Sequence, residues 1–289
     1  MPETRTFVER EGLRLAVREW PGPADHDGPP VLLLHGLSSS SHIWNLAASL
    51  LARRRRVVAY DQRGHGESGK PRSGYGFDEL AADAGAVIRE LRIRRPLVVG
   101  HSWGATVALE VAVRKERPVG GAVLLDGGFI SMSDRMDWPT ARELLRPPQI
   151  DGMPVAEFLE TWERETGLRV TPEIERLCLS IVRVGQDGAI RRRLSVANHM
   201  KILRAMWEHD VVRSLRSVRV PTLVLATRRR GAGGDEARFI EAKREAARAA
   251  RAIGDPVRFE WIEGIHDVPL ERPEAVARRI LRFPGRMAP

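Results

Sequence analysis

One segment of the sequence has the residue types and spacing of a serine nucleophile. Gly100-His101-Ser102-Trp103-Gly104 follows the apolar run Leu97 to Val99 and precedes the helical pattern Ala105 to Val113. A Gly-x-Ser-x-Gly stretch between a strand and a helix is typical of a nucleophile elbow, a sharp turn that lifts the serine hydroxyl clear of a sheet. The glycines permit the cramped backbone, and the helix N-terminus offers N–H groups to a developing oxyanion. We therefore expect Ser102 to attack a carbonyl carbon.

A serine hydroxyl is a weak nucleophile and needs a base within hydrogen-bond reach. Of the eight histidines, His266 is placed best. It follows the last expected strand, Val257 to Ile262, and precedes a helix around Pro273 to Leu281. This order puts His266 on a loop at the sheet edge that also carries the elbow. We expect His266 to take the proton of Ser102.

The negative oxygen of an acyl-transfer intermediate needs two hydrogen-bond donors, and the loss of one typically costs about 3 kcal/mol. The backbone N–H groups of Leu37 and Trp103 are the expected pair. Leu37 belongs to the loop His35-Gly36-Leu37 after the strand Val31 to Leu34, and Trp103 directly follows the nucleophile. We expect His35 to fix its own loop, and Ser38 to Ser41 to form a polar loop with a helix cap.

The elements that must position these residues are short apolar runs that alternate with longer helical patterns. Such an alternation predicts an α/β fold, a mostly parallel twisted sheet flanked by helices. Near-continuous apolar content in four runs fits strands that are buried on both faces. The first 20 residues predict a hairpin that turns at Glu11-Gly12. The expected strands are Val31 to Leu34, Val57 to Tyr60, Leu97 to Val99, Ala122 to Leu125, Leu223 to Ala226 and Val257 to Ile262.

From about Phe129 to Ser217 the alternation stops, and the pattern becomes helical without strands. Helices are expected over Pro154 to Thr166, from an N-cap at Thr171 onward, and over Ala197 to His209. We therefore divide the chain into a core, residues 1–128 and 218–289, and an inserted helical cap, residues 129–217. An apolar acyl pocket is expected beneath the cap, with the candidate lining residues Trp138, Trp162, Met200, Met206 and Trp207.

Taken together, the motifs resemble those of the α/β hydrolases. The chain has His35-Gly36 after a strand, the run Asp61 to Ser68 that is similar to the family's Asp-x-Arg-Gly-x-Gly-x-Ser loop, the elbow at Ser102, and the His266 loop followed by Leu270 and Pro273. The resemblance implies an α/β-hydrolase fold with a cap and a catalytic triad of serine, acid and histidine. We assign the Asp61 to Ser68 run a structural loop role.

The acid is the point at which the sequence departs from the family's pattern. The resemblance implies a carboxylate just after the strand Pro221 to Ala226, but Thr227 and then Arg228 to Arg230 stand there. Two carboxylates keep the chain order nucleophile, acid, histidine. Asp126 ends the strand Ala122 to Leu125, whereas Asp235 lies in a glycine-rich segment. Asp126 is preferred because a strand end is a more rigid anchor than such a loop.

Other readings of the acid remain at this point. Asp235 and Glu236 could instead favour the start of the following helix through their charge. Asp267 is adjacent to the histidine and would point elsewhere. His266 could also lack a carboxylate partner, which would leave a weak enzyme or a binding protein.

Composition excludes several classes of protein. The 289 residues are 43% hydrophobic and 29% charged, which is typical of globular chains, and no apolar run approaches the about 18 residues of a membrane span. The net charge is +9, but arginines are spread along the whole chain and nucleic-acid motifs are lacking. The single cysteine, Cys178, allows no internal disulfide and fits a cytoplasmic location.

The sequence thus predicts a cofactor-independent serine hydrolase that cleaves a small or medium ester, thioester or similarly activated carbonyl. No metal or cofactor motif stands out, and we expect a small-molecule substrate, with neither nucleic acid nor membrane as a partner and the oligomeric state open. The same motifs are compatible with a carbon–carbon bond hydrolase, an aminopeptidase, a perhydrolase or a ligand-binding protein with little turnover. Serine at the nucleophile position argues against relatives that use aspartate there. The elbow resembles that of proline iminopeptidases, but His35-Gly36-Leu37 lacks their Gly-Pro continuation.

Overall fold

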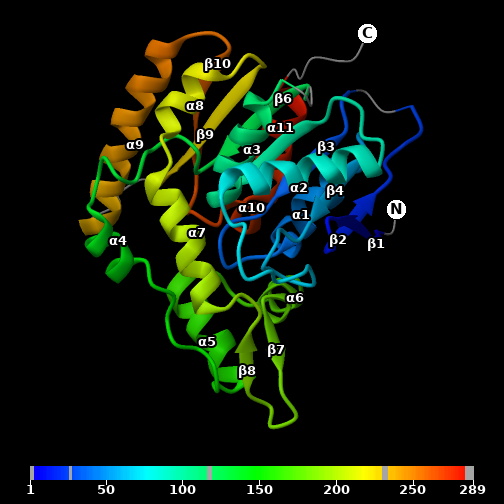
Figure 1. Ribbon diagram of the computed structural model, residues 1–289, viewed down its shortest axis with the longest axis vertical. Helices are drawn as coiled ribbons and strands as arrows, with labels where there is room; N and C mark the ends of the chain where they lie inside the picture. Colours follow the sequence, from blue (N-terminus) through cyan, green and yellow to red (C-terminus); the bar gives the residue numbers. More distant parts are fainter. Residues whose placement is uncertain (1–2, 26–27, 116–118, 230–233, 284–289) are drawn as a thin grey trace.

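Eight strands form one sheet in the order β1-β2-β4-β3-β5-β6-β9-β10 (Figure 1). The computed structural model describes residues 3–25, 28–115, 119–229 and 234–283, without the side chains of residues 234–238. The sheet and its expected strands are confirmed to within two residues at each end. Their bounds are β1 (Thr4–Arg10), β2 (Leu13–Trp20), β3 (Val31–Leu34), β4 (Val57–Tyr60), β5 (Leu97–His101), β6 (Gly121–Leu125), β9 (Thr222–Arg228) and β10 (Val257–Glu263).

The central strands are buried along their whole length, as their apolar sequences predict. Every residue of β3, β4, β5 and β6 is buried. β1 and β2 form the expected antiparallel hairpin, and β2 pairs antiparallel with β4. From β4 to β10 all neighbouring strands are parallel. Because the carboxyl ends of parallel strands meet at one edge, the residues after β3, β5, β6, β9 and β10 are brought together there.

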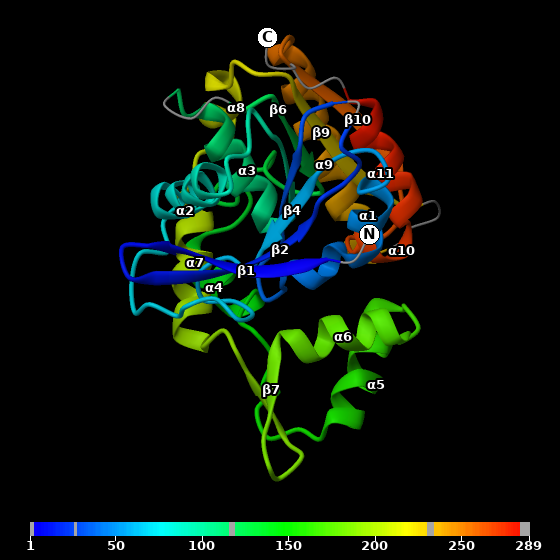
Figure 2. The ribbon, with the colours of Figure 1, turned by 90° about the vertical axis from the view of Figure 1, so that its right-hand side faces the viewer.

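Helices cover both faces of the sheet, as Figure 2 shows from the side. The helices pack on the sheet through two hydrophobic clusters. One cluster includes residues of α2, α3, α8 and α9, and the other includes residues of α1, α10 and α11. The sheet therefore lies between two helical layers, and its carboxyl edge remains open to the segment that follows β6. The helices around the sheet are η1 (Ser41–Trp44), α1 (Asn45–Leu51), α2 (Phe77–Glu90), α3 (Trp103–Val113), α8 (Val211–Ser217), α9 (Gly234–Ile253), α10 (Val268–Glu271) and α11 (Pro273–Arg282).

The segment between β6 and β9 contributes the lower part of the molecule in Figure 1. It contains α4 (Trp138–Leu144), α5 (Val155–Thr166), α6 (Pro172–Ser180) and α7 (Val196–Glu208). As expected, Thr171 caps α6, and its side chain accepts a hydrogen bond from the N–H of Ile174. Its last helix, α8, packs against α3 and α9 of the core. The bounds of α5, α6 and α7 agree with those expected from capping and periodicity to within one residue wherever the sequence analysis gave them, whereas α4 and α8 were not expected.

The expectation that this segment lacks strands is wrong. β7 (Val182–Val184) and β8 (Ile190–Arg192) form a small antiparallel sheet. Each strand has three residues, too few for an alternation to be recognised. Val182 and Ile190 are buried in one cluster with Phe158 of α5 and Cys178 of α6. The hairpin therefore completes a small separate core within the segment between β6 and β9.

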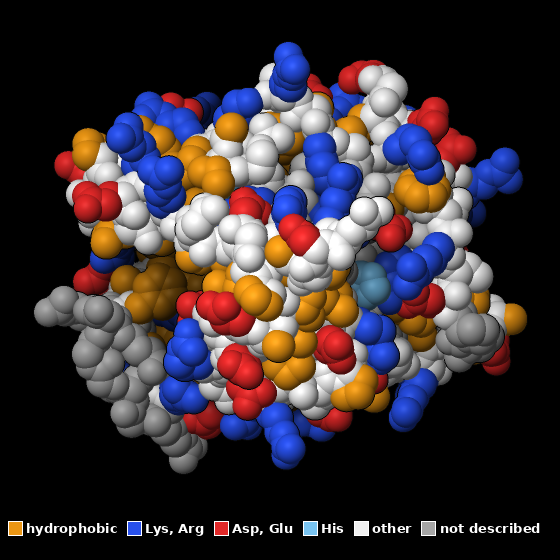
Figure 3. Space-filling view, turned by 90° about the horizontal axis from the view of Figure 1, so that it is seen from below, with side chains coloured by type: hydrophobic (Ala, Val, Ile, Leu, Met, Phe, Trp, Pro, Cys, Tyr) orange, Lys and Arg blue, Asp and Glu red, His pale blue; other side chains and the backbone are white. Residues whose placement is uncertain are grey.

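The surface of the molecule carries both signs of charge. Seen from below, on the side of the cap, Lys and Arg side chains are interspersed with Asp and Glu side chains around apolar patches (Figure 3). Among the described residues, no helix is long and apolar enough to cross a membrane.

Candidate active site

Ser102 occupies a strained turn between β5 and α3. Its φ is 55° and its ψ is −124°, a backbone conformation that non-glycine residues rarely adopt. The two glycines of the elbow allow this turn. A Cβ at Gly100 would lie 2.0 Å from the carbonyl oxygen of Gly104, and a Cβ at Gly104 would lie 2.4 Å from that of His35. The turn therefore has the sharp geometry that the pentapeptide predicts.

His266 faces Ser102 from the loop after β10. Its Nε2 lies 2.9 Å from the Oγ of Ser102, a hydrogen-bond distance. The His266 side chain is 48% exposed, so this part of the edge is open to small molecules. The structure thus brings together the two residues that the sequence places 164 positions apart.

Asp126 completes a chain of hydrogen bonds with these two residues. Its Oδ2 lies 2.7 Å from the Nδ1 of His266, and its Oδ1 accepts a 2.8 Å hydrogen bond from the N–H of Thr227. Asp126 follows β6 directly and has a φ of 48°, which turns its buried carboxylate toward the histidine. The side chain of Asp235 lies outside the described residues. Asp267 lies at the N-cap position of α10.

The charged forms of Asp126 and His266 stabilise each other. Desolvation alone would lower the pKa of His266, but the hydrogen bond and charge of Asp126 outweigh it and hold the pKa above its ordinary value. Burial alone would raise the pKa of Asp126, but the hydrogen bonds and charges of His266 and Lys243 keep it well below its ordinary value. Asp126 is therefore ionised at neutral pH, and its hydrogen bond fixes a proton on Nδ1 of His266. The Nε2 of neutral His266 is left to accept the proton of Ser102.

Two backbone N–H groups are available next to Ser102. A Cβ at Gly36 would lie 3.1 Å from the Cβ of Ser102, so the loop after β3 runs close to the nucleophile. Within the described part of the chain, the N–H groups of Leu37 and Trp103 donate to no other protein group. Trp103 is the first residue of α3, where N–H groups have no partner within the helix. Both expected oxyanion donors are thus free and near the elbow.

His35 fixes the loop, in agreement with the expected structural role. Its Nδ1 donates to the carbonyl of Gly36 at 2.8 Å, and its Nε2 accepts from the N–H of Gln62 at 2.9 Å. The Gln62 side chain in turn donates to the carbonyl of His35 at 2.7 Å. These bonds join the loop after β3 to the loop after β4.

The Asp61 to Ser68 run also has a structural role. Asp61 accepts 2.8 Å hydrogen bonds from the N–H groups of Ser41 and Glu67. His65 accepts a 3.2 Å hydrogen bond from the N–H of Ser38, which directly follows Leu37. The hydroxyl of Ser38 lies 2.9 Å from Nδ1 of His199 in α7, which ties this loop to the cap.

The sequence analysis missed two side chains that contact the hydrogen-bonded chain of Ser102, His266 and Asp126. His101, the second residue of the elbow motif, donates from Nε2 to the carbonyl oxygen of His266 at 2.8 Å. Burial and the neighbouring charge of His266 lower the pKa of His101 to about 4, so its ring is neutral. Lys243 of α9 lies 2.7 Å from Asp126. No local motif marks either role, because both depend on residues that are distant in the sequence.

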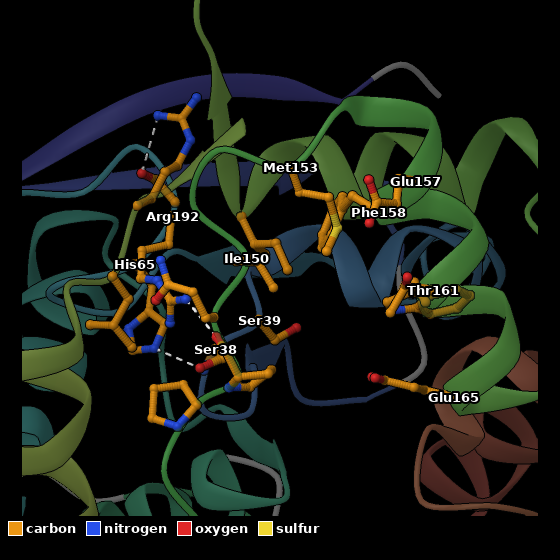
Figure 4. Close-up of a pocket in the computed structure, with 18 of the residues that line it drawn as sticks. Ser38, Ser39, His65, Ile150, Met153, Glu157, Phe158, Thr161, Glu165 and Arg192 are labelled. Carbon is orange, nitrogen blue, oxygen red and sulfur yellow. Dashed lines mark hydrogen bonds between the residues drawn. The ribbon is translucent and has the colours of Figure 1, made fainter. Parts of the chain in front are cut away.

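A cavity of about 410 Å³ lies beneath α5 (Figure 4). Ile150, Met153 and Phe158 of the cap line it, with Ser38 and His65 on the core side. Among its lining residues are neither Ser102 nor His266, but Ser38 is one residue from Leu37. Of the five residues expected to line an acyl pocket, only Trp162 lines this cavity.

The other four candidates have different surroundings. Trp138 and Trp207 lie with ring centroids 6.0 Å apart, and the Arg204 guanidinium lies over both rings. Met206 packs against the core, and Met200 lines a separate hollow beside α2. These four residues therefore do not line the cavity beneath α5. In the described part of the chain, no cluster of three or more His, Cys, Asp or Glu side chains could hold a metal ion.

The mostly parallel sheet, the serine elbow and the histidine loop define a class of protein, the α/β hydrolases. The model of the alpha/beta hydrolase family matches residues 31–279, and the chain belongs to this family. An uncharacterized protein of Mycobacterium tuberculosis is 35% identical over 130 residues, which cover 45% of this chain and 37% of that protein. A haloalkane dehalogenase of Mesorhizobium japonicum is 34% identical over 134 residues, 45% of this chain and 43% of the relative. The matches thus span less than half of these curated relatives.

Solved structures resemble the chain over its whole length. The crystal structure of E-2-(acetamidomethylene)succinate hydrolase superimposes with a TM-score of 0.77 at 24% identity and covers 98% of this chain and 99% of that chain. At this identity, the similarity shows the fold alone.

Proposed function

We propose that this protein is a cofactor-independent serine hydrolase that cleaves a small or medium ester, thioester or similarly activated carbonyl compound. The observation that carries the proposal is the hydrogen-bonded chain of Ser102, His266 and Asp126, with distances of 2.9 Å and 2.7 Å. A serine, a histidine and a buried carboxylate in this order are the parts of an acyl-transfer triad. The chain's membership in the alpha/beta hydrolase family supports the same chemistry.

Each triad residue has a defined part in the proposed reaction. Nε2 of His266 takes the proton of Ser102 as Oγ attacks the carbonyl carbon, and the N–H groups of Leu37 and Trp103 hold the oxygen that becomes negative. Asp126 stabilises the imidazolium that forms. His266 then gives its proton to the leaving group, and an acyl ester on Ser102 remains. Water, deprotonated by the same histidine, attacks this ester and releases the acid and the free serine.

The cap segment supplies the proposed binding space. Residues 129–217 form the lid in this proposal, and the cavity beneath α5 takes the acyl group. Ile150, Met153 and Phe158 give it an apolar wall, Ser38 and Thr161 offer hydroxyl groups, and the lining also includes charged side chains, among them Glu157, Glu165 and Arg192. Apolar walls combined with placed polar groups are typical of small-molecule sites. The proposed substrate is therefore a small molecule. A cytoplasmic location remains a prediction from the single cysteine.

The proposal is tested with a series of p-nitrophenyl esters of increasing acyl length. We expect turnover by the wild-type protein, and an acyl adduct in its intact mass when the reaction is quenched early. Ser102→Ala removes the nucleophile and lowers kcat/KM at least about 10³-fold. Ser49→Ala, at an exposed serine of α1, is the matched control and keeps the wild-type rate.

A ligand-binding protein of the same fold gives the opposite result. The folded wild-type protein then turns over none of the esters and forms no acyl adduct, and the proposed function is wrong. Turnover that persists in Ser102→Ala also contradicts it, because another group would then carry the reaction.

A further inference from the structure

The triad acid has a second cationic partner. The ammonium of Lys243, on α9, lies 2.7 Å from Oδ1 and 3.0 Å from Oδ2 of Asp126. It also donates to Thr227, at 3.0 Å to the carbonyl oxygen and 2.8 Å to the hydroxyl oxygen. Lys243 is only 4% exposed. Its three N–H bonds thus point to acceptors at the ends of β6 and β9.

A buried ammonium at this place is unexpected from composition and from energetics. Only four of the 47 basic residues are lysines, so the chain uses arginine for nearly all of its positive charge. Burial of a cation is unfavourable unless close partners compensate, so a surface role does not explain Lys243. Its main compensating charge is Asp126, which also serves His266. One carboxylate is therefore shared by two cationic groups.

We propose that Lys243 is a positioning residue of the catalytic site, which holds the Asp126 carboxylate toward His266 and shares its negative charge. The inference rests on the proposed function, because it assigns Lys243 a part in the same triad. The ammonium at Oδ1 and the N–H of Thr227 fix the carboxylate in the orientation that turns Oδ2 toward Nδ1 of His266. Lys243 does not line the cavity beneath α5, so it acts on the triad and not on substrate binding.

The shared charge sets how strongly His266 keeps its proton. The titratable and charged groups that face its ring are Asp126 from β6, Asp267 from its own loop, His101 from β5 and Lys243 from α9. The two carboxylates raise the pKa of His266, and the positive charge of Lys243 lowers it. Without Lys243, Asp126 would hold the imidazolium more tightly, and less of the neutral base would exist at mildly acidic pH.

The test compares two substitutions that separate charge from positioning. Lys243→Gln removes the charge and keeps an N–H donor, whereas Lys243→Met removes both. For each variant, kcat/KM is measured with p-nitrophenyl acetate from pH 5.5 to pH 9. Lys115→Gln, at an exposed lysine after α3, is the control for the change in net charge.

We expect the acid limb of the pH profile of kcat/KM to move to higher pH in both Lys243 variants. In Lys115→Gln it stays where it is in the wild-type protein. Relative to wild type, kcat/KM of Lys243→Gln falls at least about threefold more at pH 5.5 than at pH 9. Lys243→Met in addition lowers kcat at pH 9, because the carboxylate loses a donor, while KM is unchanged in both variants. An equal loss at every pH, or a wild-type profile, overturns the inference.

A second measurement, of thermal stability, tests the pairing of Lys243 with Asp126 independently of activity. In an Asp126→Asn chain, Lys243 is a buried cation without its carboxylate. We expect Lys243→Gln to lower the Tm of the wild-type chain and to raise the Tm of the Asp126→Asn chain. A loss of Tm in both backgrounds contradicts the pairing. If the wild-type protein shows no Ser102-dependent esterase activity, the proposed function fails, whereas an active protein with an unmoved pH profile refutes only the inference on Lys243.

Discussion

The ends of β6 and β9 lie side by side at the edge of the sheet that carries Ser102. An acidic side chain follows β6, whereas β9 ends in a hydroxyl and a basic side chain. Asp126 directly follows β6, and its carboxylate is buried and hydrogen-bonded to His266. β9 carries Thr227 at the corresponding place, where the family resemblance implies an acid, and then Arg228. The N–H of Asp126 donates to the carbonyl of Leu225 at 3.0 Å, and the N–H of Thr227 donates to Oδ1 of Asp126 at 2.8 Å. The second strand end thus supports the acid that the first one carries.

This difference indicates that the carboxylate must lie within hydrogen-bond reach of Nδ1 of His266, whichever strand carries it. Parallel neighbouring strands end at the same edge, so an acid one strand away still reaches Nδ1 of His266. Placing the acid after β6 instead of after β9 has a structural requirement. Asp126 has a φ of 48°, and a Cβ at the following Gly127 would lie 2.1 Å from the carbonyl oxygen of Ser102. Glycine at 127 therefore allows the acid to turn next to the elbow.

The largest expected effect separates the two strand ends directly. Asp126→Asn removes the charge that stabilises the imidazolium and lowers kcat/KM about 10⁴-fold. Thr227→Val keeps the backbone N–H that Asp126 accepts from and costs less than about tenfold. Both variants are measured on a p-nitrophenyl ester, with circular dichroism as the check on folding. Equal losses in the two variants would remove the distinction between β6 and β9.

The pH dependence of the wild-type enzyme comes next. The pKa of His266 is raised, and its neutral form is the base, so kcat/KM falls about tenfold per pH unit below that pKa. The contribution of this charged pair to folding stability has the reverse sign. It is complete below the pKa of His266 in the unfolded chain and is lost as pH rises through the folded-state pKa. We expect half-maximal kcat/KM above about pH 6.5, the ordinary histidine value, and a midpoint below that value would contradict the charge of Asp126 as its cause.

The close approach of Gly127 to the backbone of Ser102 predicts an effect on the free energy of unfolding. Gly127→Ala forces a methyl group against the backbone of Ser102 and lowers the free energy of unfolding by about 1–3 kcal/mol. Gly76→Ala is the matched control, because a Cβ at Gly76 meets nothing within 4 Å, and it costs less than about 1 kcal/mol. Urea denaturation measures both. If the two variants are equally stable, the close approach of Gly127 to the elbow is not a constraint.

The smallest expected effect concerns the alternative acid. Asp235→Asn keeps kcat/KM within about twofold of wild type, because His266 already has Asp126 as its partner. The same ester assay checks this. A large loss in Asp235→Asn, with full activity in Asp126→Asn, would move the acid from β6 to the segment after β9.

Much of the fold was predictable from the sequence because the central strands are buried on both faces. β3 and β4 have the expected bounds, since their residues are continuously apolar and polar residues end them. The meeting of Ser102, His266 and Asp126 at one edge was predictable, because each lies directly after a strand or in the loop that follows one, and strand order fixes where the carboxyl ends meet. The placement of these residues needed no knowledge of side-chain packing.

What the sequence did not predict depends on contacts between distant elements. Lys243 lies in an alanine-rich helix, and only the packing of α9 along β10 turns it toward Asp126. β7 and β8 are too short for a periodic signal, and their pairing depends on a small core with α5 and α6. The lining of the cavity beneath α5 was not readable for the same reason, because helical periodicity does not tell which neighbour an apolar face contacts.

Covalent labelling with a fluorophosphonate, followed by intact mass and peptide mapping, tests directly whether Ser102 is the nucleophile and Asp126 its acid. We expect a single adduct on Ser102 in the wild-type protein, no adduct in Ser102→Ala, and labelling at least about 10³-fold slower in Asp126→Asn. A folded wild-type protein that stays unlabelled, or an Asp126→Asn variant that is labelled at the wild-type rate, would contradict it.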